Sequence, residues 1–305
     1  KGTRRTYESQ RDDPVGSLPA MASLLWFRQD LRLTDNPALL AARRVAGPII
    51  PVFIWAPEEE GAWAPGAASR WWPHNSLASL DESLRVRGSR LIFRQGPSLE
   101  TLRSLANETG ARAIFWNRRY EPYIVHRDEQ IGKELTGDGH TAESSNGSLL
   151  FEPWQVHNSS GKPFQVFTAF WKACRKLPPP PLPEGTPSRL AAPERWPDSL
   201  GLNELQLLPP VDWAEGLRES WRPGEQGAAA ELSRFLKEAL ATYHTDRDLP
   251  ARKGTSRLSP HLHFGEMSAR QVWHAVCSRV VSRKAPIALE GSETYLRELG
   301  WREFA

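Results

Sequence analysis

Cysteine is almost absent from the chain: only Cys174 and Cys277 occur among its 305 residues. Two cysteines are too few for the disulfide scaffold of a small secreted domain, and they form neither a CxxC pair nor a Cys/His cluster with zinc-ligand spacing. His261 and His263 have no third ligand at a suitable spacing, so we expect no metal site. A reducing cytoplasm is the simplest location for such a chain.

Long hydrophobic runs are absent too. No apolar stretch approaches the ~20 residues that cross a bilayer, which excludes an integral membrane protein and gives no reason to expect a membrane partner. The phosphate-binding patterns GxGxxG and GxxxxGK[ST] do not occur either. Lys plus Arg number 39 and Asp plus Glu 36, so the formal net charge is only +3. That balance neither requires nor excludes a nucleic-acid partner.

Short apolar runs alternate with longer amphipathic ones from about residue 23 to residue 151. This rhythm is typical of βαβ units, so we predict an α/β domain with a parallel, Rossmann-like sheet over residues 23–151. The predicted strands are Leu24–Phe27, Ile49–Trp55, Arg90–Phe93, Ala113–Trp116 and Leu149–Phe151. Helices are predicted from Pro37, with Asn36 as the cap, and over Asn75–Arg87, Leu99–Thr109 and Ile124–Leu135.

Proline dominates the next part of the chain. The run Pro178–Pro181 and the later Pro209 and Pro210 argue against a regular helix or a central strand, so residues 152–223 are predicted to be a long interdomain linker. From residue 224 the pattern becomes helical, which predicts an all-helical domain over residues 224–305. The helices expected there are Ala228–Leu240, Val272–Val280 behind a capping box of Ser268 and Gln271, and a last helix capped by Ser292.

The two ends of the chain also carry expectations. Residues 1–22 are polar up to Met21, and we expect a disordered, vector-derived or upstream extension there. At the other end, Ala305 falls inside the last predicted helix with no glycine or proline after it. We therefore expect the helical domain to be incomplete at its C-terminus.

One informative segment is Gly254–Pro260, with sequence GTSRLSP. Three hydroxyls and an arginine lie close together, and Ser259 before Pro260 is typical of a helix cap followed by a first helical residue. Backbone N–H groups and hydroxyls at such a point suit a diphosphate. Taken alone, the segment is better explained as an ordinary capped loop, because such clusters are common.

A second segment is Glu293–Phe304, with sequence ETYLRELGWREF. Helical spacing places Tyr295, Glu298 and Arg302 on neighbouring turns of one face, with Trp301 beside Glu298. A carboxylate, a guanidinium and two aromatic rings on one face are unusual for a hydrophobic contact, so a ligand site is one of two equally supported interpretations. The alternative is a packed aromatic stripe with an ion pair from Glu298 to Arg302.

Both segments belong to a larger pattern. The chain resembles the DNA photolyase and cryptochrome family over nearly all of residues 23–305, and most resembles a bacterial class I cyclobutane pyrimidine dimer photolyase truncated within its FAD-binding domain. The motifs that carry the resemblance, in the family's order and spacing, are Leu25–Asn36 (LWFRQDLRLTDN), Trp116–Pro122 (WNRRYEP), Pro163–Trp171 (PFQVFTAFW), Arg247 with Asp248, Gly254–Leu262, His263–Glu266 (HFGE) and Trp301–Phe304 (WREF).

The resemblance implies an α/β domain that can hold a light-harvesting antenna chromophore, of folate or deazaflavin type, and a helical domain that binds FAD. The positions that match the family's FAD site are Tyr243, Thr255, Ser256, Arg257, Leu258, Ser259, Tyr295, Glu298 and Arg302. Tyr295 stands where some members carry Trp. Arg247 matches a position that contacts DNA phosphate, and Glu298 and Trp301 match the residues that touch the damaged bases, which makes these two the catalytic candidates.

The implied activity is that of a deoxyribodipyrimidine photo-lyase, a carbon–carbon lyase. In the family, light excites reduced FAD, which gives an electron to a cyclobutane pyrimidine dimer; the ring splits and the electron returns. The cofactor carries the difficult step, and the protein supplies placement and access. Photolyases take the damaged bases out of the DNA stack, and the ring of Trp301 can stack on a base with about 1–3 kcal/mol. The expected partner is DNA that contains pyrimidine dimers, and the expected state is a monomer.

Two other functions compete with repair. A cryptochrome uses the same flavin domain for blue-light signalling without repair, although Trp301 beside Glu298 favours repair. A truncated chain can instead be a non-catalytic nucleotide-binding fragment. Since half a pocket leaves a cofactor exposed, we expect residues 1–305 alone to bind FAD weakly or not at all and to be inactive.

Overall fold

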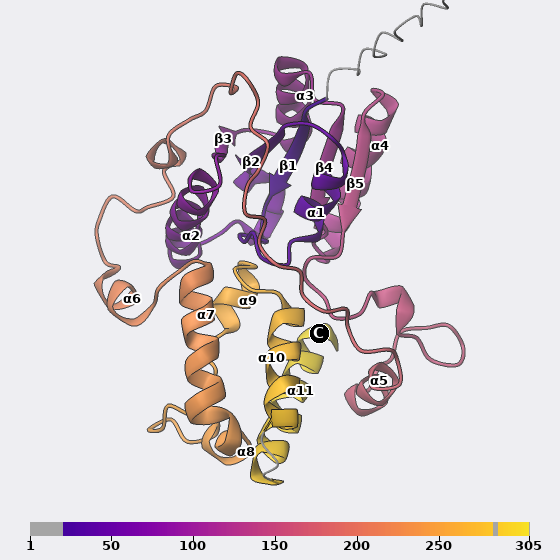
Figure 1. The fold of residues 1–305 in the computed structure, drawn as a ribbon, viewed down its shortest axis with the longest axis vertical. Helices are drawn as coiled ribbons and strands as arrows, with labels where there is room; N and C mark the ends of the chain where they lie inside the picture. The colour runs from indigo at the N-terminus through magenta and orange to yellow at the C-terminus, as the bar shows by residue number, and fades with distance from the viewer. Residues whose placement is uncertain (1–20, 283–285, 305) are drawn as a thin grey trace, which may run out of the picture.

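The computed structural model of the protein describes residues 21–282 and 286–304. Ala305 and nearly all of the predicted extension over residues 1–22 lie outside the described residues. An α/β half and a helical half lie one above the other (Figure 1). The segment between them climbs over the α/β half before it returns to the helical half (Figure 1), and its Leu190 and Leu200 donate backbone hydrogen bonds to Arg87 and Phe93.

The α/β half is built on one parallel sheet. Its strands are β1 (Ser23–Phe27), β2 (Ile49–Trp55), β3 (Ile92–Gln95), β4 (Ala113–Asn117) and β5 (Thr141–Ser145). Their order is β3-β2-β1-β4-β5, so the chain works outward from β1 in one direction and then restarts at β4 on the other side. The predicted parallel α/β fold is confirmed, and the reversal between β1 and β4 creates a crevice at the carboxyl ends of these strands.

The fifth predicted strand is wrong. Leu149–Phe151 is not a strand; the edge strand is β5, whose sequence TAESS has no apolar run. All five of its residues are exposed or half-buried. Because none of them has to be apolar, the strand lacks the hydrophobic pattern by which the others were recognised. Leu150 and Phe151 belong instead to the core of the helical half.

The helices of the α/β half are α1 (Pro37–Arg44), α2 (Ala67–Arg85), α3 (Ser98–Thr109) and α4 (Pro122–Gly137). All four were predicted, although α2 begins at Ala67 rather than at Asn75. The cap of α1 is confirmed, because Asn36 Oδ1 accepts the backbone N–H of Leu39 at 3.1 Å. A 3-10 segment, η1 (Pro57–Trp63), connects β2 to α2.

The proline-rich segment contains helices that were not predicted. They are α5 (Phe167–Cys174) and α6 (Glu215–Ser220), with the 3-10 turns η2 (Pro153–Gln155) and η3 (Leu202–Leu205). The prolines lie outside α5, whose Phe167, Phe170 and Trp171 are buried in the core of the helical half. Tertiary packing therefore stabilises a short helix that local composition argued against.

The helical half contains α7 (Glu225–Arg234), the π-turn η4 (Phe235–Ala239), η5 (Leu240–Thr242), α8 (Tyr243–Asp246), α9 (Ser259–His263), α10 (Ala269–Ser282) and α11 (Pro286–Phe304). The predicted capping box of α10 is confirmed: the backbone N–H of Gln271 donates to Ser268 Oγ at 3.0 Å, and that of Ser268 to Gln271 Oε1 at 2.9 Å. Ser292 is not a cap, since it is buried inside α11, and Ser259 is the first residue of α9 rather than its cap.

A buried joint of charged residues fixes the two halves together. Asp35 is fully buried and accepts hydrogen bonds from Ser268 Oγ at 2.5 Å and from the Arg270 guanidinium at 2.7 Å. The Arg32 guanidinium donates to the backbone oxygen of Gly265 at 2.9 Å. Because all these groups are compensated across the joint, the relative placement of the two halves is well defined. No helix in the described part of the chain has the length and apolar character needed to span a membrane.

Candidate functional site

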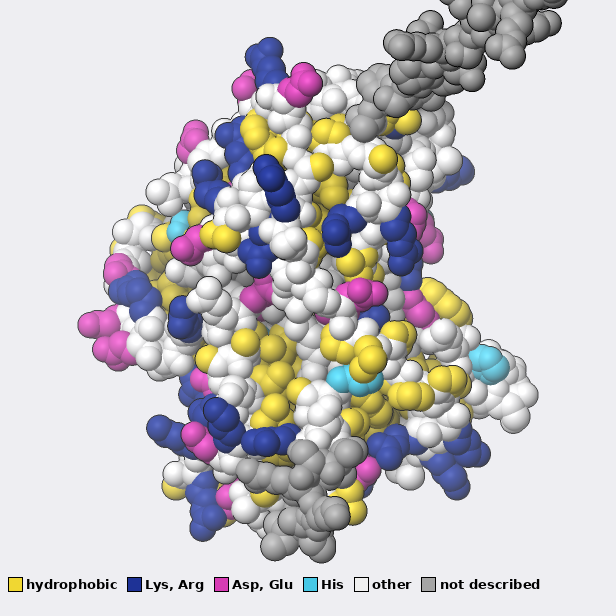
Figure 2. Space-filling model, viewed as in Figure 1, with side chains coloured by type: hydrophobic (Ala, Val, Ile, Leu, Met, Phe, Trp, Pro, Cys, Tyr) yellow, Lys and Arg dark blue, Asp and Glu magenta, His cyan; other side chains and the backbone are white. Residues whose placement is uncertain are grey.

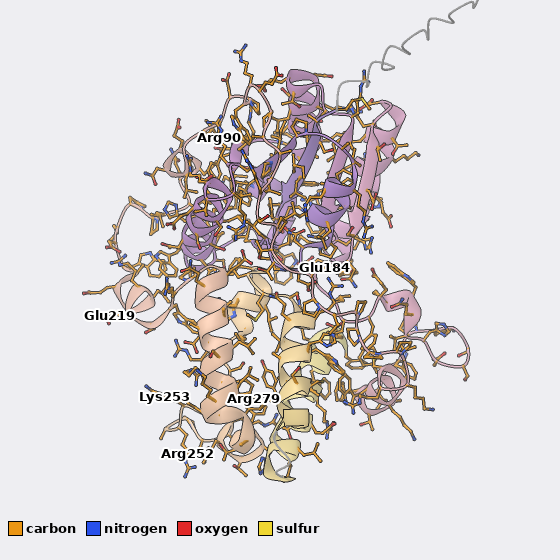
Figure 3. All side chains as sticks on the ribbon, in the orientation of Figure 1. Arg90, Glu184, Glu219, Arg252, Lys253 and Arg279 are labelled. Atoms are coloured by element: carbon orange, nitrogen blue, oxygen red, sulfur yellow. The ribbon has the colours of Figure 1, made fainter. Side chains whose placement is uncertain are left out.

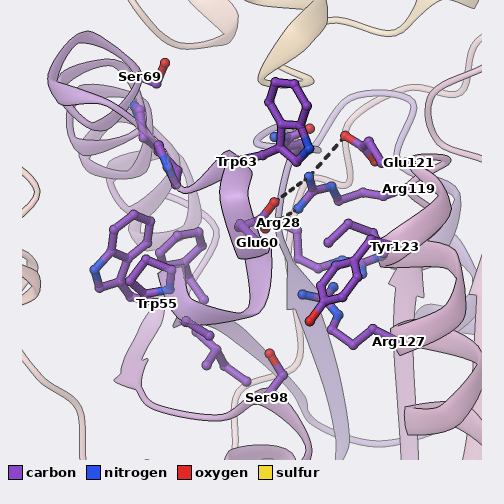
Figure 4. Close-up of a pocket in the computed structure, with 18 of the residues that line it drawn as sticks. Arg28, Trp55, Glu60, Trp63, Ser69, Ser98, Arg119, Glu121, Tyr123 and Arg127 are labelled. Atoms are coloured by element: carbon purple, nitrogen blue, oxygen red, sulfur yellow. Dashed lines mark hydrogen bonds and ion pairs between the residues drawn. The ribbon is translucent and has the colours of Figure 1, made fainter.

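A cavity of about 750 Å³ lies at the carboxyl ends of the strands, where the strand order reverses. We call it the strand-end cavity. Trp26 and Arg28 come from β1 and its following loop, Trp55 ends β2, and Tyr123 and Arg127 lie on α4. Figure 4 shows Trp55 on one side and Tyr123 with Arg127 on the other. Aromatic walls with a few charged groups suit a flat, partly anionic ligand.

Arginines provide the charge in this cavity. The guanidinium of Arg28 lies 4.4 Å from the ring centroid of Trp26, and that of Arg127 lies 5.6 Å from it. Arg28 is buried and pairs with Asp128. Figure 4 shows Arg119 between Glu60 and Glu121, with nitrogen to oxygen distances of 2.6 Å and 3.0 Å. These cations are held by fixed carboxylates, so the cavity is preorganised.

A second cavity, of about 730 Å³, lies between the two halves, and we call it the interface cavity. Its α/β wall includes Arg118–Pro122, which follow β4, and Ser148 with Leu149. Its helical wall comes from α8, the segment before α9, α9 itself and α11. The volume lies within the range of cavities that bind small molecules and cofactors.

The two cavities share part of their lining. The residues that face both are Gln29, Arg119, Glu121, Pro122 and His263. Burial would raise the pKa of Glu121, but the hydrogen bond and charge of Arg119 outweigh it and lower that pKa. Burial lowers the pKa of His263, against the opposing charge of Glu121.

Six residues predicted for the site come together in the interface cavity: Tyr243, Ser256, Ser259, Tyr295, Glu298 and Arg302. The rings of Tyr243 and Tyr295 meet edge to face with centroids 5.0 Å apart. Burial, followed by the charge of Glu298, raises the pKa of Tyr243, and burial raises that of Tyr295. Both phenols are therefore neutral at physiological pH.

Arg302 is positioned by the loop before η2. Its guanidinium donates to the backbone oxygen of Ser148 at 3.0 Å and to Ser148 Oγ at 2.8 Å. The next residue, Glu303, accepts the backbone N–H of Leu150 at 2.7 Å. Burial raises the pKa of Glu303 to about 7, although Arg302 and the backbone N–H groups oppose the rise.

Three residues of the predicted FAD site do not line the cavity. Arg257 has a left-handed backbone, with φ of 57°, and its guanidinium lies 4.0 Å from the ring centroid of Trp221. Leu258 is fully buried in the core, and Thr255 is exposed, with its backbone oxygen accepting from Arg234 at 2.8 Å. Of the three hydroxyl residues in Gly254–Pro260, only Ser256 and Ser259 therefore line the cavity.

The two remaining predicted residues, Arg247 and Trp301, do not line the cavity either. Arg247 forms an ion pair with Glu298, and its guanidinium lies 5.8 Å from the ring centroid of Tyr243. Trp301 stacks on Phe167 of α5, with centroids 3.7 Å apart and planes 10° apart. Trp301 is still 44% exposed, so a large aromatic side chain on α11 meets solvent.

Several other lining residues carry little or no signal in the sequence. Trp63 on η1, Tyr123 and Arg127 line the strand-end cavity, and Arg118 and Tyr120 line the interface cavity. Arg118 and Tyr120 fall in the WNRRYEP motif, which was the available signal. Among the described residues no group of three His, Cys, Asp or Glu side chains is arranged to hold a metal ion.

Comparison with known proteins places this geometry in a family. The DNA photolyase family profile matches residues 23–188. Deoxyribodipyrimidine photo-lyase of Agrobacterium fabrum is 43% identical over 94% of this chain and 59% of its own length. Cryptochrome-1 of Arabidopsis thaliana is 40% identical over 93% of this chain and 42% of its own length. The crystal structure of a bacterial class III photolyase from Agrobacterium tumefaciens superimposes with a TM-score of 0.89 at 41% identity, over 96% of this chain and 60% of that one.

The chain belongs to the DNA photolyase family, as the motifs indicated. It spans about three fifths of the photo-lyases it matches and a smaller share of the cryptochrome.

Proposed function

We propose that the whole protein uses light and reduced FAD to split cyclobutane pyrimidine dimers in DNA. The observation that carries the proposal is the interface cavity, which gathers Tyr243, Ser256, Tyr295, Glu298 and Arg302 in a chain of the DNA photolyase family. The photo-lyase relative at 43% identity supports repair. We propose DNA as the partner and a cytoplasmic monomer as the working form.

The chemistry of the interface cavity fits FAD. Ser256 and Ser259 offer hydroxyls, and Arg302 and Arg118 offer guanidinium groups, which suit a diphosphate. The buried rings of Tyr243 and Tyr295 supply apolar surface for a flat ring system. When bound, reduced FAD would supply the light-driven electron.

The side chains around this cavity would divide the remaining work. Glu298 lines the cavity and can hydrogen-bond a pyrimidine edge. Trp301 is exposed beside it on α11 and can stack on a displaced base. Thr255, Arg257 and Leu258 would act by shaping the segment before α9, since their side chains point elsewhere.

A second chromophore of folate or deazaflavin type is proposed for the strand-end cavity. Trp26, Trp55 and Tyr123 provide aromatic walls, and Arg28 and Arg127 provide positive charge for an anionic tail. The lining shared by the two cavities would keep such a chromophore close to FAD.

A cryptochrome is the second candidate, because the chain is 40% identical to Cryptochrome-1 of Arabidopsis thaliana. One experiment separates the candidates. The purified chain is incubated with FAD, reduced, and illuminated with an oligonucleotide that carries one thymine dimer, and the absorbance of bound flavin and the restored thymines are measured. Light-dependent restoration supports repair, and flavin binding without restoration supports a cryptochrome. If neither flavin binding nor restoration is observed, this chain is the non-catalytic fragment or needs more of the protein to hold FAD.

A further inference from the structure

Arg247 and Glu298 close a contact at the edge of the interface cavity. Arg247 directly follows α8, and Glu298 lies on α11, so their ion pair joins two elements across the edge. Glu298 lines the cavity, whereas Arg247 does not. The Arg247 side chain is 33% exposed and the Glu298 side chain 39%. Both partners can therefore be reached by a ligand that approaches from solvent.

Arg247 has few other partners. Its Nε lies 3.6 Å from Asp248, whose side chain is 75% exposed, and its guanidinium lies beside the ring of Tyr243. The hydrogen bond with Glu298 raises the pKa of Arg247, so this side chain is a permanent cation. A permanent cation whose carboxylate partners, Glu298 and Asp248, are both partly exposed can exchange Glu298 for another anion.

We propose that Arg247 exchanges Glu298 for a backbone phosphate when DNA binds, so that contact with the DNA backbone and release of Glu298 into the cavity are one event. The proposal rests on the proposed function, because DNA is the anion it requires. In this role Arg247 is a positioning residue: in the free protein it holds Glu298 at the edge, and in the complex it leaves Glu298 free to meet a base.

The energetics permit this exchange. Exposed ion pairs contribute little to stability and weaken further in salt. A guanidinium matches phosphate geometry with two parallel hydrogen bonds, and the counterions that DNA releases favour the contact. Basic side chains are present on the helical half (Figure 2), and Arg252 and Lys253 lie at its outer end (Figure 3).

A double-mutant cycle tests the exchange. Glu298→Gln removes the carboxylate that competes with phosphate, so DNA should bind about two- to fivefold tighter, the fold-change that matches an exposed ion pair. Glu293→Gln is the matched control, because it makes the same charge change on α11, where Glu293 pairs with Arg175 at 3.1 Å. Each variant is made with Arg247 present and in the Arg247→Gln background. The readout is fluorescence anisotropy of a short labelled duplex with one thymine dimer, and of the same duplex undamaged.

The expected result is a gain for Glu298→Gln that disappears in the Arg247→Gln background, while Glu293→Gln has little effect in either. Arg247→Gln should also reduce the slope of log affinity against log salt by about 0.9, the value for one lost phosphate contact. Arg247→Lys keeps the charge and should keep that slope, which separates the charge from a folding defect.

Three outcomes would overturn the proposal. If the gain persists in the Arg247→Gln background, it comes from net charge alone. If Glu298→Gln binds no more tightly than the wild type, the exchange is refuted while the DNA partner stands. If no variant and no wild-type protein binds either duplex, the proposed DNA partner fails for this chain and the exchange fails with it.

Discussion

Gly265 lies so close to Gln29 that a Cβ atom built on Gly265 would stand 2.1 Å from the Gln29 backbone oxygen. This contact brings the turn after α9 against the loop after β1, beside the cavity lining that includes Gln29 and His263. Gly265 also has a φ of +65°, in the left-handed region. The position therefore demands glycine for two separate reasons.

Gly265→Ala should lower the free energy of unfolding by more than the strain of placing an alanine in the left-handed region. A left-handed alanine alone costs about 1–3 kcal/mol, and the backbone clash adds to it. Gly110→Ala is the matched control, because Gly110 has a φ of +67° and nothing within 4 Å of the added Cβ. Denaturant unfolding of both variants gives the difference. Equal losses would show that the close approach to Gln29 relaxes without cost.

The buried joint predicts an asymmetry between two Asp–Arg pairs. Asp35→Asn should lower the free energy of unfolding by about 3–5 kcal/mol, because it leaves the buried Arg270 contact uncompensated, and Asn tolerates the positive φ of Asp35. Asp212→Asn breaks an exposed pair with Arg218 at 2.8 Å and should leave the free energy of unfolding nearly unchanged, because solvent screens the pair. Chemical unfolding measures both, and similar losses would contradict the assigned importance of burial.

Glu303 predicts a pH dependence of stability. Burial raises its pKa from the ordinary 4.5 to about 7, so between these values the native protein holds a proton that the unfolded chain has released. Stability from this group is therefore present below about pH 4 and falls as pH rises to about 7. Against Glu303→Gln, which does not titrate, the wild type should lose up to about 3 kcal/mol across this window, at 1.36 kcal/mol per pKa unit. Parallel stability profiles for the two proteins from pH 4 to pH 8 would refute the shift.

The stack of Trp301 on Phe167 should contribute to the stability of the protein although Trp301 is partly exposed. Trp301→Ala removes the stack on Phe167, which should cost about 0.5–1.5 kcal/mol beyond the lost burial. Trp213→Ala is the control, since Trp213 is 43% exposed and has no stacked ring among the described residues. Trp301→Phe should recover most of the difference. The measurement is thermal unfolding, and equal effects of the two alanine variants would argue against the stack.

The sequence predicted what depends on local periodicity and missed what depends on distant contacts. The first four strands and the cap at Asn36 have local signals, whereas β5 is polar and is held only by its pairing with β4. Leu149–Phe151 looked like a strand because apolar residues also fill a helical core. Runs of apolar residues identify burial but not the element that is buried.

The same limit applies to the site. The motifs indicated the segments of the interface cavity, but not which side chains in them face it. Ser256 and Arg257 are neighbours, yet the positive φ of Arg257 sends its guanidinium to Trp221. Trp63 and Tyr123 carry no pattern that links them, because only the return of the chain at the strand ends brings η1 and α4 to one cavity.

The joint around Asp35 and Arg32 also governs how the protein comes apart. The helical half supplies partners for charged groups that the α/β half encloses, so pulling the halves apart would leave Asp35 without Arg270 and Arg32 without the backbone oxygen of Gly265. The α/β half would then hold a buried carboxylate without its counter-charge. Heating should accordingly melt the chain in one concerted step, with the sheet and the helices lost at the same temperature.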